Sequence, residues 1–282
     1  AQSSSTWPLA FPQTTFTNSC RFNNDSSDYL IRTPSGASNR DAWTLSLWIK
    51  RCNLGTYQSI YGIYADANNQ ENFGFDDSDR FFWQLYQSGS AVGQLTSNRV
   101  FRDTSAWYNI VAVYDSANST AGNRMRLYIN SVEETSFATD TNPSSGLDSL
   151  WNSTTAHSIG RINTTNYIDM YLAEFIHVDG QALTPTSFGA TNPVTNIWEP
   201  ISYAGTYGTN GFKLNFADSS NLGDDTSGNG NDFTANNLTS IDQSTDTCSN
   251  NFCVLNSLCR TNGSFSNGSL ELDQNGSTGH TI

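Results

Sequence analysis

The stretch "WTLSLWIK", residues 43–50, alternates between apolar and polar side chains over most of its length. The apolar side chains at every second position would share one face of a strand: Trp43, Leu45, Leu47 and Ile49. A period of two is typical of a β-strand that turns one face to the core and the other to solvent. The stretch therefore predicts a half-buried strand in a protein built from sheets.

Similar patterns recur on both sides of this stretch. "RMRLYIN" (124–130) alternates, and "WYNIVAVYD" (107–115) is apolar on both faces, which is typical of a central strand. "FGFDDSDRFFWQLY" (73–86) predicts a hairpin that turns at "DDSD". Only "LTPTSFG" (183–189) carries a helical signal, with Pro185 at the first helical position. We therefore expect an all-β fold, with two antiparallel sheets packed face to face.

Composition limits the partners of the chain. Only 14% of its 282 residues are charged, the net charge is −13, and Lys50 and Lys213 are the only lysines. A polyanion would be repelled, so we expect no nucleic-acid partner. An acidic surface suits Ca²⁺, although the charge can also serve solubility alone. No apolar run approaches 18 residues, so we expect no membrane span.

Composition also divides the chain into three parts. Residues 1–18 are rich in Ser, Thr and Pro and predict an extended arm, residues 19–240 hold the strands, and residues 241–282 form a Cys-containing tail rich in Asn, Gly and Ser. Either arm can add a strand to a neighbouring copy, or fold back on its own domain. In the first case, alternate side chains of the tail would fill pockets of the neighbour: Phe265, Leu270 and Leu272.

The cysteines and the sequons point to an oxidising, secretory setting. We expect disulfides that tie the arms to the body through Cys20, Cys248, Cys253 and Cys259, with Cys52 left as a buried thiol or an intermolecular link. No CxxC pair occurs, which argues against zinc. The opening "AQSSSTWPLAFPQ" fits a mature end after leader removal. Eight sequons are candidate glycosylation sites: Asn24, Asn118, Asn152, Asn163, Asn237, Asn262, Asn267 and Asn275.

Several motifs follow one another in a recognisable order. They are "DYLIRTPSGASNRDAWTLSLWIKR", "AWYNIVAVYD", "RMRLYIN", "YIDMYLAEFIHVDGQALTPTSFG", "YGTNGFKLNF" and "DDTSGNGNDFTANN". Over residues 19–252 the chain resembles the laminin-G-like, concanavalin A-like jelly-roll domains of phage and environmental microbial proteins. The resemblance implies a β-sandwich on a virion or cell surface, often linked to glycans or calcium. Lectins, glycosidases, pentraxins and structural modules share this fold, so it does not fix the activity.

Three kinds of site are candidates. Carboxylates near "DDTSGNGND" predict a calcium site formed by Asp218, Asp224, Asp225 and Asp232, with a network of Asx turns as the alternative. Trp151 and Trp198 lie in loop-like segments and are candidates for stacking on sugars, or else belong to the core. Hydrolases with this fold usually carry their catalytic carboxylates in a pattern such as E-x-D-x-E, which is absent from this sequence. Alternation places Glu174 beside Leu172 and Ile176, as a structural acid, so we expect no catalytic residue.

The leading hypothesis is a non-catalytic structural protein, extracellular or on the surface of a virion or cell appendage. In this hypothesis a jelly-roll protomer assembles with its own copies into a fibre or appendage through the terminal arms. The alternative is a calcium-dependent, lectin-like adhesion module that binds carbohydrate. A polysaccharide hydrolase is the third and weakest hypothesis.

Overall fold

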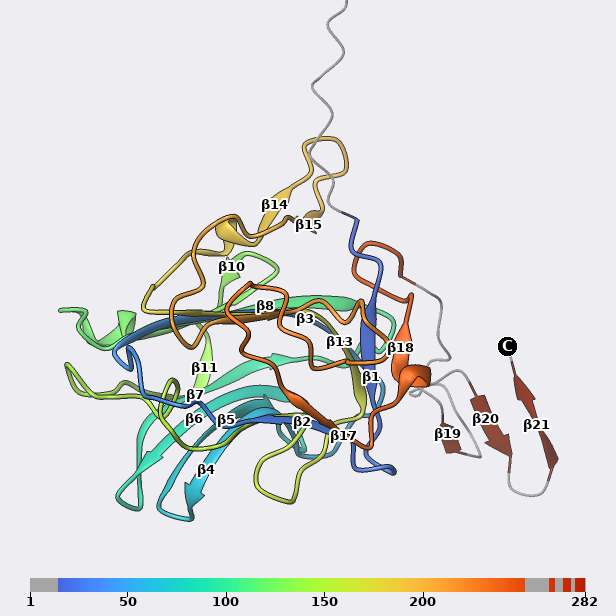
Figure 1. Cartoon of the computed structure of the whole chain (residues 1–282), viewed down its shortest axis with the longest axis horizontal. Coiled ribbons are helices and arrows are strands. Elements are labelled where there is room, and N and C mark those ends of the chain that lie inside the picture. The colour runs from blue at the N-terminus through green and yellow to red at the C-terminus, as the bar shows by residue number, and fades with distance from the viewer. Residues whose placement is uncertain (1–14, 252–263, 267–270, 275–276, 282) are drawn as a thin grey trace, which may run out of the picture.

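Two antiparallel sheets lie face to face, as the strand pattern predicts (Figure 1). The computed structural model describes residues 15–251, 264–266, 271–274 and 277–281, with side chains over 15–251. In Figure 1, β3, β8 and β13 form the upper layer, and β4 to β7 form the lower layer. This arrangement confirms the all-β jelly-roll sandwich.

The upper layer, sheet A, has the strand order β10-β9-β8-β3-β13-β1-β18, and β16 pairs with β13. Its strands are β1 (Ser19–Phe22), β3 (Ala42–Arg51), β8 (Trp107–Asp115), β9 (Met125–Ile129), β10 (Val132–Glu133), β13 (Met170–Asp179), β16 (Phe212–Leu214) and β18 (Gln243–Ser244). The lower layer, sheet B, has the order β11-β7-β6-β5-β4-β12-β2-β17. Its strands are β2 (Tyr29–Arg32), β4 (Gln58–Asp66), β5 (Asn69–Phe75), β6 (Arg80–Gln87), β7 (Ser90–Val100), β11 (Phe137–Thr141), β12 (His157–Ile159) and β17 (Thr234–Asn236).

The remaining elements are short. Two strands, β14 (Gly189–Thr191) and β15 (Trp198–Pro200), pair in a hairpin that projects beyond sheet A (Figure 1). Single 3₁₀ turns lie at Ala121–Asn123, Pro185–Ser187 and Ser240–Asp242, and loops form the other connections. The helical signal around Pro185 is thus one turn long. Among the described residues, no helix is long and apolar enough to span a membrane.

Aromatic rings fill the space between the sheets. Trp43 of β3 stacks on Trp151 and on Tyr114, with ring centroids 4.5 and 5.6 Å apart, and Trp151 also contacts Tyr61 at 4.1 Å. All four side chains are at most 1% exposed. Stacked and tilted rings at these separations are typical of stable aromatic clusters, so this group forms the centre of the core.

The outer face of sheet A is covered, which corrects one prediction. The polar face of β3 was expected to meet solvent, yet Thr44, Ser46 and Lys50 are at most 2% exposed. Thr44 Oγ1 donates to the Gln181 carbonyl, and Lys50 Nζ lies 2.7 Å from Asp246 Oδ2. Loops after β13 and after β18 therefore lie over this face, and a pattern of period two cannot reveal a polar cover.

The described parts of the two arms fold back on the domain and on each other. Residues 245–251, named the strap, lie beside the segment that leads into β1. Thr247 Oγ1 donates to the Phe16 carbonyl (2.9 Å), and the Phe16 amide donates to Ser249 Oγ (3.3 Å). Ser19 Oγ also donates to the Asp246 carbonyl (2.6 Å). Of the two alternatives for the arms, these contacts favour the folded-back one for residues 16–19 and 245–251.

The tail carries a small sheet of its own. Strands β19 (Ser264–Ser266), β20 (Glu271–Gln274) and β21 (Ser277–Thr281) form an antiparallel meander. Among the described strands they pair only with one another. The assembly candidates Phe265 and Leu272 lie on β19 and β20, whereas Leu270 lies outside the described residues.

Candidate functional site

Sheet B has a hollow on its outer face, across β6, β7 and β11. Register places Phe82 opposite Thr96 and Gln84 opposite Gln94, and Thr139 of β11 lies opposite Thr96. This sheet-B hollow is lined by Tyr57, Asp76, Arg80, Phe82, Gln84, Gln94, Thr96 and Thr139. Because side chains alternate along a strand, these residues face away from the core rings of the same strands. The hollow is therefore an outward-facing feature of the sandwich.

An exposed aromatic ring stands at the edge of the hollow. The Tyr57 ring stacks on Phe82, with centroids 4.6 Å apart. Tyr57 is 38% exposed, whereas Phe82 is 4% exposed and supports it from below. Partial burial also raises the pKa of the Tyr57 hydroxyl to about 12, so it keeps its proton at physiological pH. The arrangement presents a neutral, fixed ring to solvent.

Polar side chains without partners lie beside this ring. The Gln84 and Gln94 amides, and the Thr96 and Thr139 hydroxyls, have no hydrogen-bond partner within the described part of the chain. The charged groups of the hollow, Asp76 and Arg80, neutralise each other in an ion pair of 2.8 Å. The hollow thus offers uncharged donors and acceptors to a ligand.

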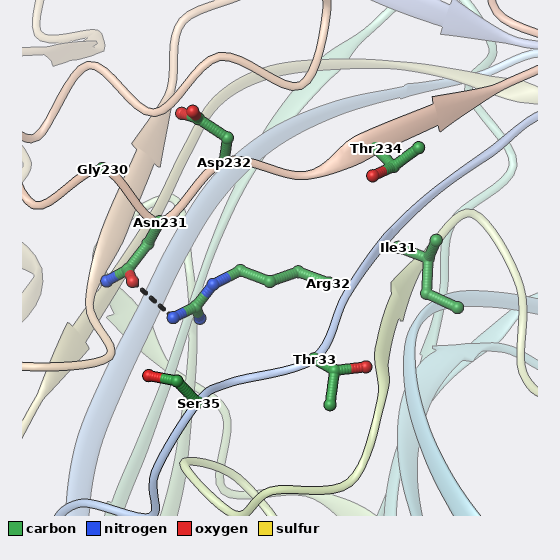
Figure 2. A pocket seen from close by; sticks show the side chains of 8 residues that line it. All are labelled: Ile31, Arg32, Thr33, Ser35, Gly230, Asn231, Asp232 and Thr234. Atoms are coloured by element: carbon green, nitrogen blue, oxygen red, sulfur yellow. Dashed lines mark hydrogen bonds between the residues drawn. The ribbon is translucent and has the colours of Figure 1, made fainter.

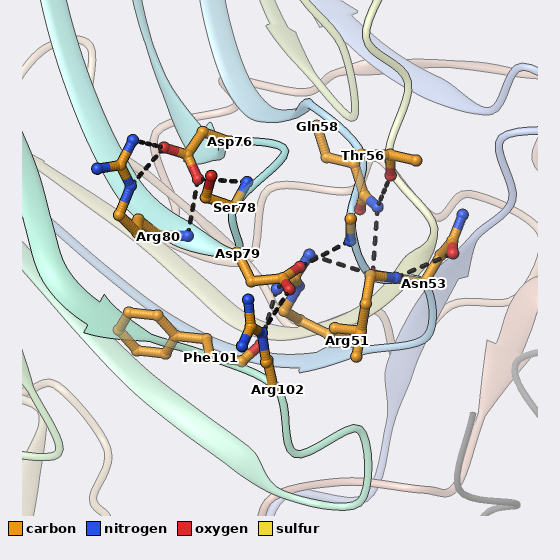
Figure 3. A network of polar contacts seen from close by, with 12 residues as sticks. Arg51, Asn53, Thr56, Gln58, Asp76, Ser78, Asp79, Arg80, Phe101 and Arg102 are labelled. Carbon is orange, nitrogen blue, oxygen red and sulfur yellow. Dashed lines mark hydrogen bonds and ion pairs between the residues drawn. The ribbon is translucent and has the colours of Figure 1, made fainter. Parts of the chain in front are cut away.

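A polar network holds the loop that carries Tyr57 (Figure 3). Asp79 Oδ1 accepts hydrogen bonds from Arg51 Nη1 (3.1 Å) and from the Gly55 amide (2.8 Å), and Asp79 Oδ2 accepts one from Arg102 Nε (2.9 Å). Burial opposes the charge of Asp79, but these hydrogen bonds and the Arg51 charge outweigh it and lower the pKa of the carboxyl. An ionised Asp79 therefore joins the 76–79 turn to the 53–57 loop.

A second hollow lies where β2 ends, beside the loop that leads into β17. This Arg32 hollow is lined by Ile31, Arg32, Thr33, Ser35, Gly230, Asn231, Asp232 and Thr234. In Figure 2 the Arg32 side chain extends toward Asn231, with Asp232 on the β17 side and Ser35 on the β2 side. Arg32 Nη2 donates to the side-chain oxygens of Asn231 and, at 3.2 Å, Asn210.

The carboxylates of the predicted calcium loop serve the loop itself. Asp225 accepts hydrogen bonds from the amides of Lys213, Ser227 and Asn231, each at 2.8–2.9 Å. Asp232 Oδ1 accepts one from the Asp225 amide (2.9 Å). These contacts form the network of turns that the sequence left as the alternative.

Among the described residues, the four predicted calcium ligands do not form one cluster of carboxylates. Asp218 accepts hydrogen bonds from Ser220, in a turn of its own, and Asp224 is partly exposed. Over the described residues, no group of three or more His, Cys, Asp or Glu side chains gathers closely enough to hold a metal ion. Calcium needs six to eight oxygen ligands, and the oxygens of Asp225 already accept hydrogen bonds from the backbone.

One strongly perturbed acid lies inside the core. Burial raises the pKa of Glu71 to about 7. Its carboxyl accepts hydrogen bonds from Trp83 Nε1 (3.1 Å), Ser149 Oγ (2.7 Å) and the Leu150 amide (2.8 Å). Because Glu71 is 1% exposed, it cannot reach a substrate, and we assign it a structural role.

Sequence comparison supplies the family. The family model described as the concanavalin A-like lectin/glucanases superfamily (Laminin_G_3) matches residues 24–187, more than half of the chain. The chain belongs to this superfamily. The match includes β2 to β13 and confirms the resemblance seen in the sequence motifs. A comparison with curated proteins gives no match.

Several solved structures are similar to this superfamily member. A native heptameric SAP-like pentraxin from Limulus polyphemus is 17% identical, with a TM-score of 0.43, and the alignment covers 60% of this chain and 78% of the pentraxin. Domains LG4-5 of the mouse laminin alpha1 chain are 12% identical, with a TM-score of 0.43, and 70% of this chain and 47% of that chain are covered. This chain therefore spans about half of that laminin structure.

A third similar structure is domain 4 of AbnA, a GH43 extracellular arabinanase from Geobacillus stearothermophilus, in complex with arabinotriose. Its identity is 18%, its TM-score is 0.41, and the alignment covers 56% of this chain and 69% of that domain.

Neither tryptophan candidate lies on an open surface of this superfamily member. Trp151 is fully buried and stacks on Trp43, so of its two alternatives the core one holds. Trp198 is partly buried, and its Nε1 donates to Asn109 Oδ1 (3.0 Å) on the covered face of sheet A. Both segments look like loops in the sequence, but Trp151 packs into the core, and Trp198 lies on β15 and packs against a cluster on sheet A.

Exposure separates the predicted glycosylation sites. Asn24, Asn163 and Asn237 are exposed, and Asn118 is partly exposed. Asn152 is 1% exposed, and its Nδ2 donates to Asp179 Oδ1 (2.9 Å), so it is not an acceptor in the folded chain. The other three sequons lie outside the described residues: Asn262, Asn267 and Asn275.

The cysteine prediction is also corrected in part. Cys20 and Cys248 are thiols in the structure. Cys20 lies in the core between the sheets, whereas Cys248 packs against Trp48 and Cys52 on the outer face of sheet A. A disulfide between Cys20 and Cys248 would have to cross the sheet. Cys52 is buried, as predicted, and Cys253 and Cys259 lie outside the described residues.

Sequence reasoning missed the residues of both hollows. In "FFWQLY" (81–86), Phe82 and Gln84 alternate with the core residues Phe81, Trp83 and Leu85, so the pattern does place them on the outer face. The sequence does not give the register that brings Gln94 opposite Gln84, nor the loop that brings Tyr57 over Phe82.

Proposed function

We propose that the chain is a non-catalytic carbohydrate-binding module of an extracellular surface, and that the sheet-B hollow contacts the sugar. The observation that carries this proposal is the exposed Tyr57 ring beside the unpartnered amides of Gln84 and Gln94. A sugar presents apolar C–H faces and many hydroxyls. A neutral ring with free amides beside it complements both, in the way that few, well-placed polar groups give specificity to a binding site.

The fold supports an extracellular setting. Laminin-G-like domains are typically extracellular, and members of the superfamily often bind carbohydrates. The chemistry of the hollow supports a non-catalytic role, because glycoside hydrolysis generally needs two carboxyl groups about 5–9.5 Å apart. Asp76 is the one carboxylate that lines the hollow, and it is bound to Arg80.

A glycan array followed by titration calorimetry tests this proposal. Tyr57→Ala is expected to weaken the best array ligand by about tenfold or more, because aromatic anchors dominate small interfaces. Gln84→Ala and Gln94→Ala are each expected to weaken it by a few-fold. The matched control is Gln181→Ala, since Gln181 lies far from the hollow and bonds to Thr206. The proposal fails if no array ligand binds, or if Tyr57→Ala binds as tightly as the control.

Assembly between copies is a second proposal, and one observation favours it. The outer strands of the tail meander, β19 and β21, each pair with β20 alone among the described strands. Unpaired strand edges are templates for pairing with another chain. We propose that residues 264–281, rather than the folded-back segments, join copies at a virion or appendage surface.

Light scattering after size-exclusion chromatography tests assembly. The full chain is expected to increase in mass with concentration, and a chain lacking residues 252–282 is expected to stay monomeric. The same mass for both chains at every concentration would exclude the tail as the joining element. A monomeric full chain would leave carbohydrate binding as the function of the module.

A further inference from the structure

Arg32 is a cation without an anionic partner. Eight of the basic side chains in the described part of the chain form ion pairs, and Arg32 is not among them. Its hydrogen-bond partners are two neutral amide oxygens, those of Asn210 and Asn231, and both are bound by the same nitrogen, Nη2. The second terminal nitrogen, Nη1, has no hydrogen-bond partner among the described residues.

Partial burial makes this unpaired charge unfavourable. Arg32 is partly buried, and desolvation lowers the pKa of its guanidinium. A desolvated charge is unfavourable unless a partner compensates it. Asp225 and Asp232 act on it only at longer range and form no ion pair with it. In a chain of net charge −13, a cation held this way is positioned for a partner from outside.

The wall of the Arg32 hollow indicates what kind of molecule would bring that partner. Thr33, Ser35 and Thr234 contribute hydroxyls, and Ile31 is the only apolar side chain of the lining. Thr33 and Ser35 are exposed. Hydroxyl groups around a guanidinium match the ring hydroxyls of a sugar, whereas a peptide side chain would find little apolar surface.

We propose that the Arg32 hollow binds the carboxylate of an acidic sugar such as a uronic acid. The carboxylate lies against the guanidinium, where charge-assisted hydrogen bonds are strong, and the ring hydroxyls meet the Thr and Ser side chains. Asp232, which is exposed on the β17 side, carries the same charge as the ligand and weakens its binding. This site is separate from the sheet-B hollow and does not depend on it.

Titration of the full ¹⁵N-labelled chain by NMR tests the inference, with three probes. They are galacturonic acid, its neutral counterpart galactose, and lactate as a single carboxylate without a sugar ring. Galacturonic acid is expected to shift the Arg32 Nε–H signal and the Thr33 and Thr234 amide signals. It is expected to bind about tenfold or more tightly than either other probe, because only it supplies both the charge and the ring.

Two variants move the affinity in opposite directions. Arg32→Gln is expected to reduce galacturonic acid binding by about tenfold or more. Asp232→Asn is expected to increase it by about threefold, since it removes a like charge while its Oδ1 still accepts from the Asp225 amide. Asp232→Asn keeps the test valid if Arg32→Gln does not fold. Asp140→Asn is the matched control, because it removes an exposed carboxylate on β11, at the opposite edge of sheet B, and leaves this affinity unchanged.

Several outcomes of these titrations bear on the two proposed sugar sites. Equal affinities for galactose and galacturonic acid would overturn the inference, because the hollow would then bind neutral polyols. Equal affinities for lactate and galacturonic acid would overturn the sugar assignment. An absence of shifts, or weaker binding to Asp232→Asn, would overturn the site as proposed. A failed glycan array with positive galacturonic acid shifts would reject the sheet-B site alone.

Discussion

Asp246 Oδ2 lies 2.7 Å from Lys50 Nζ, and this ion pair is buried on the outer face of sheet A. The side chains are 5% and 1% exposed. The other oxygen of Asp246 accepts a hydrogen bond from Trp107 Nε1 (3.0 Å), and Lys50 also donates to Asn251 Oδ1 (2.8 Å). One carboxylate of the strap thus joins β3 and β8.

Asp246→Asn is expected to lower the free energy of unfolding by about 3–5 kcal/mol, because it leaves the Lys50 charge buried and unpaired. Urea unfolding followed by tryptophan fluorescence measures this change. The control is Asp148→Asn, which breaks the more exposed pair with Arg40 and is expected to change the free energy by less than about 1 kcal/mol. Equal, small changes in both variants would show that the strap contributes little to stability.

Glu71 is expected to make stability depend on pH. Its pKa in the folded chain is about 7, above the ordinary value of 4.5. Between pH 4.5 and 7, the Glu71 carboxyl therefore keeps its proton in the folded chain but loses it in the unfolded chain. Stability from this group is therefore full below about pH 4.5 and falls by about 3 kcal/mol as pH rises to 7.

A comparison of Glu71→Gln with the parent chain isolates this effect. Burial lowers the pKa of His157 to about 4, which gives the opposite slope below pH 6.5, and that slope is common to both chains. The difference in unfolding free energy between the two chains should therefore change steadily from pH 4.5 to 7.5. A constant difference across this range would contradict a protonated Glu71.

Calcium is expected to leave the thermal stability of the chain unchanged. An ion bound to the folded state alone would raise the melting temperature as its concentration increases, but Asp225 is already engaged by backbone amides. Differential scanning calorimetry with calcium and with a chelator checks this. A calcium-dependent rise that disappears in Asp224→Ala with Asp225→Ala would restore the metal site predicted from the sequence.

Glycosylation is expected at Asn24 and Asn163, and not at Asn152. The first two side chains are exposed and make no hydrogen bond within the described residues, whereas Asn152 is buried. Asn237 is exposed, but its Nδ2 donates to the carbonyls of Ser26 and Ser27 (2.9 and 3.0 Å), so we expect low occupancy. Peptide mass spectrometry after secretion from insect cells measures each site, and a glycan on Asn152 would contradict its folded environment.

Alternation predicted the inner faces of the strands wherever the strands are regular. Met125, Leu127 and Ile129 all point to the core, as the sequence of β9 indicates. In β13 the prediction was wrong, because a bulge between Ala173 and Ile176 changes the phase, with Glu174 at φ 46°. Glu174 therefore meets Lys213 at 2.9 Å instead of sharing a face with Leu172. Bulges depend on pairing with a neighbour, which a single sequence does not show.

The candidate sites were harder to predict than the fold. Trp151 and Asn152 follow a polar, loop-like segment, yet contacts with Trp43 and Asp179 bury them. Such burial arises from segments distant in sequence. The sheet-B hollow likewise combines the loop residue Tyr57 with Gln84 and Gln94 of two different strands. Local periodicity gives the face of each residue, but the register and the loop paths decide which residues meet.

The contacts between Phe16 and the strap also have a mechanical consequence. Because the Phe16 carbonyl and amide bond to Thr247 and Ser249, the segments before and after the sandwich leave it at one point. Tension between these segments would act first on those bonds and on the β1–β18 pair, and would open them one after another. The other strands of the two sheets would stay unloaded until the strap and β18 had peeled away, so a pull along the chain would lengthen it before the rest of the sandwich unfolded.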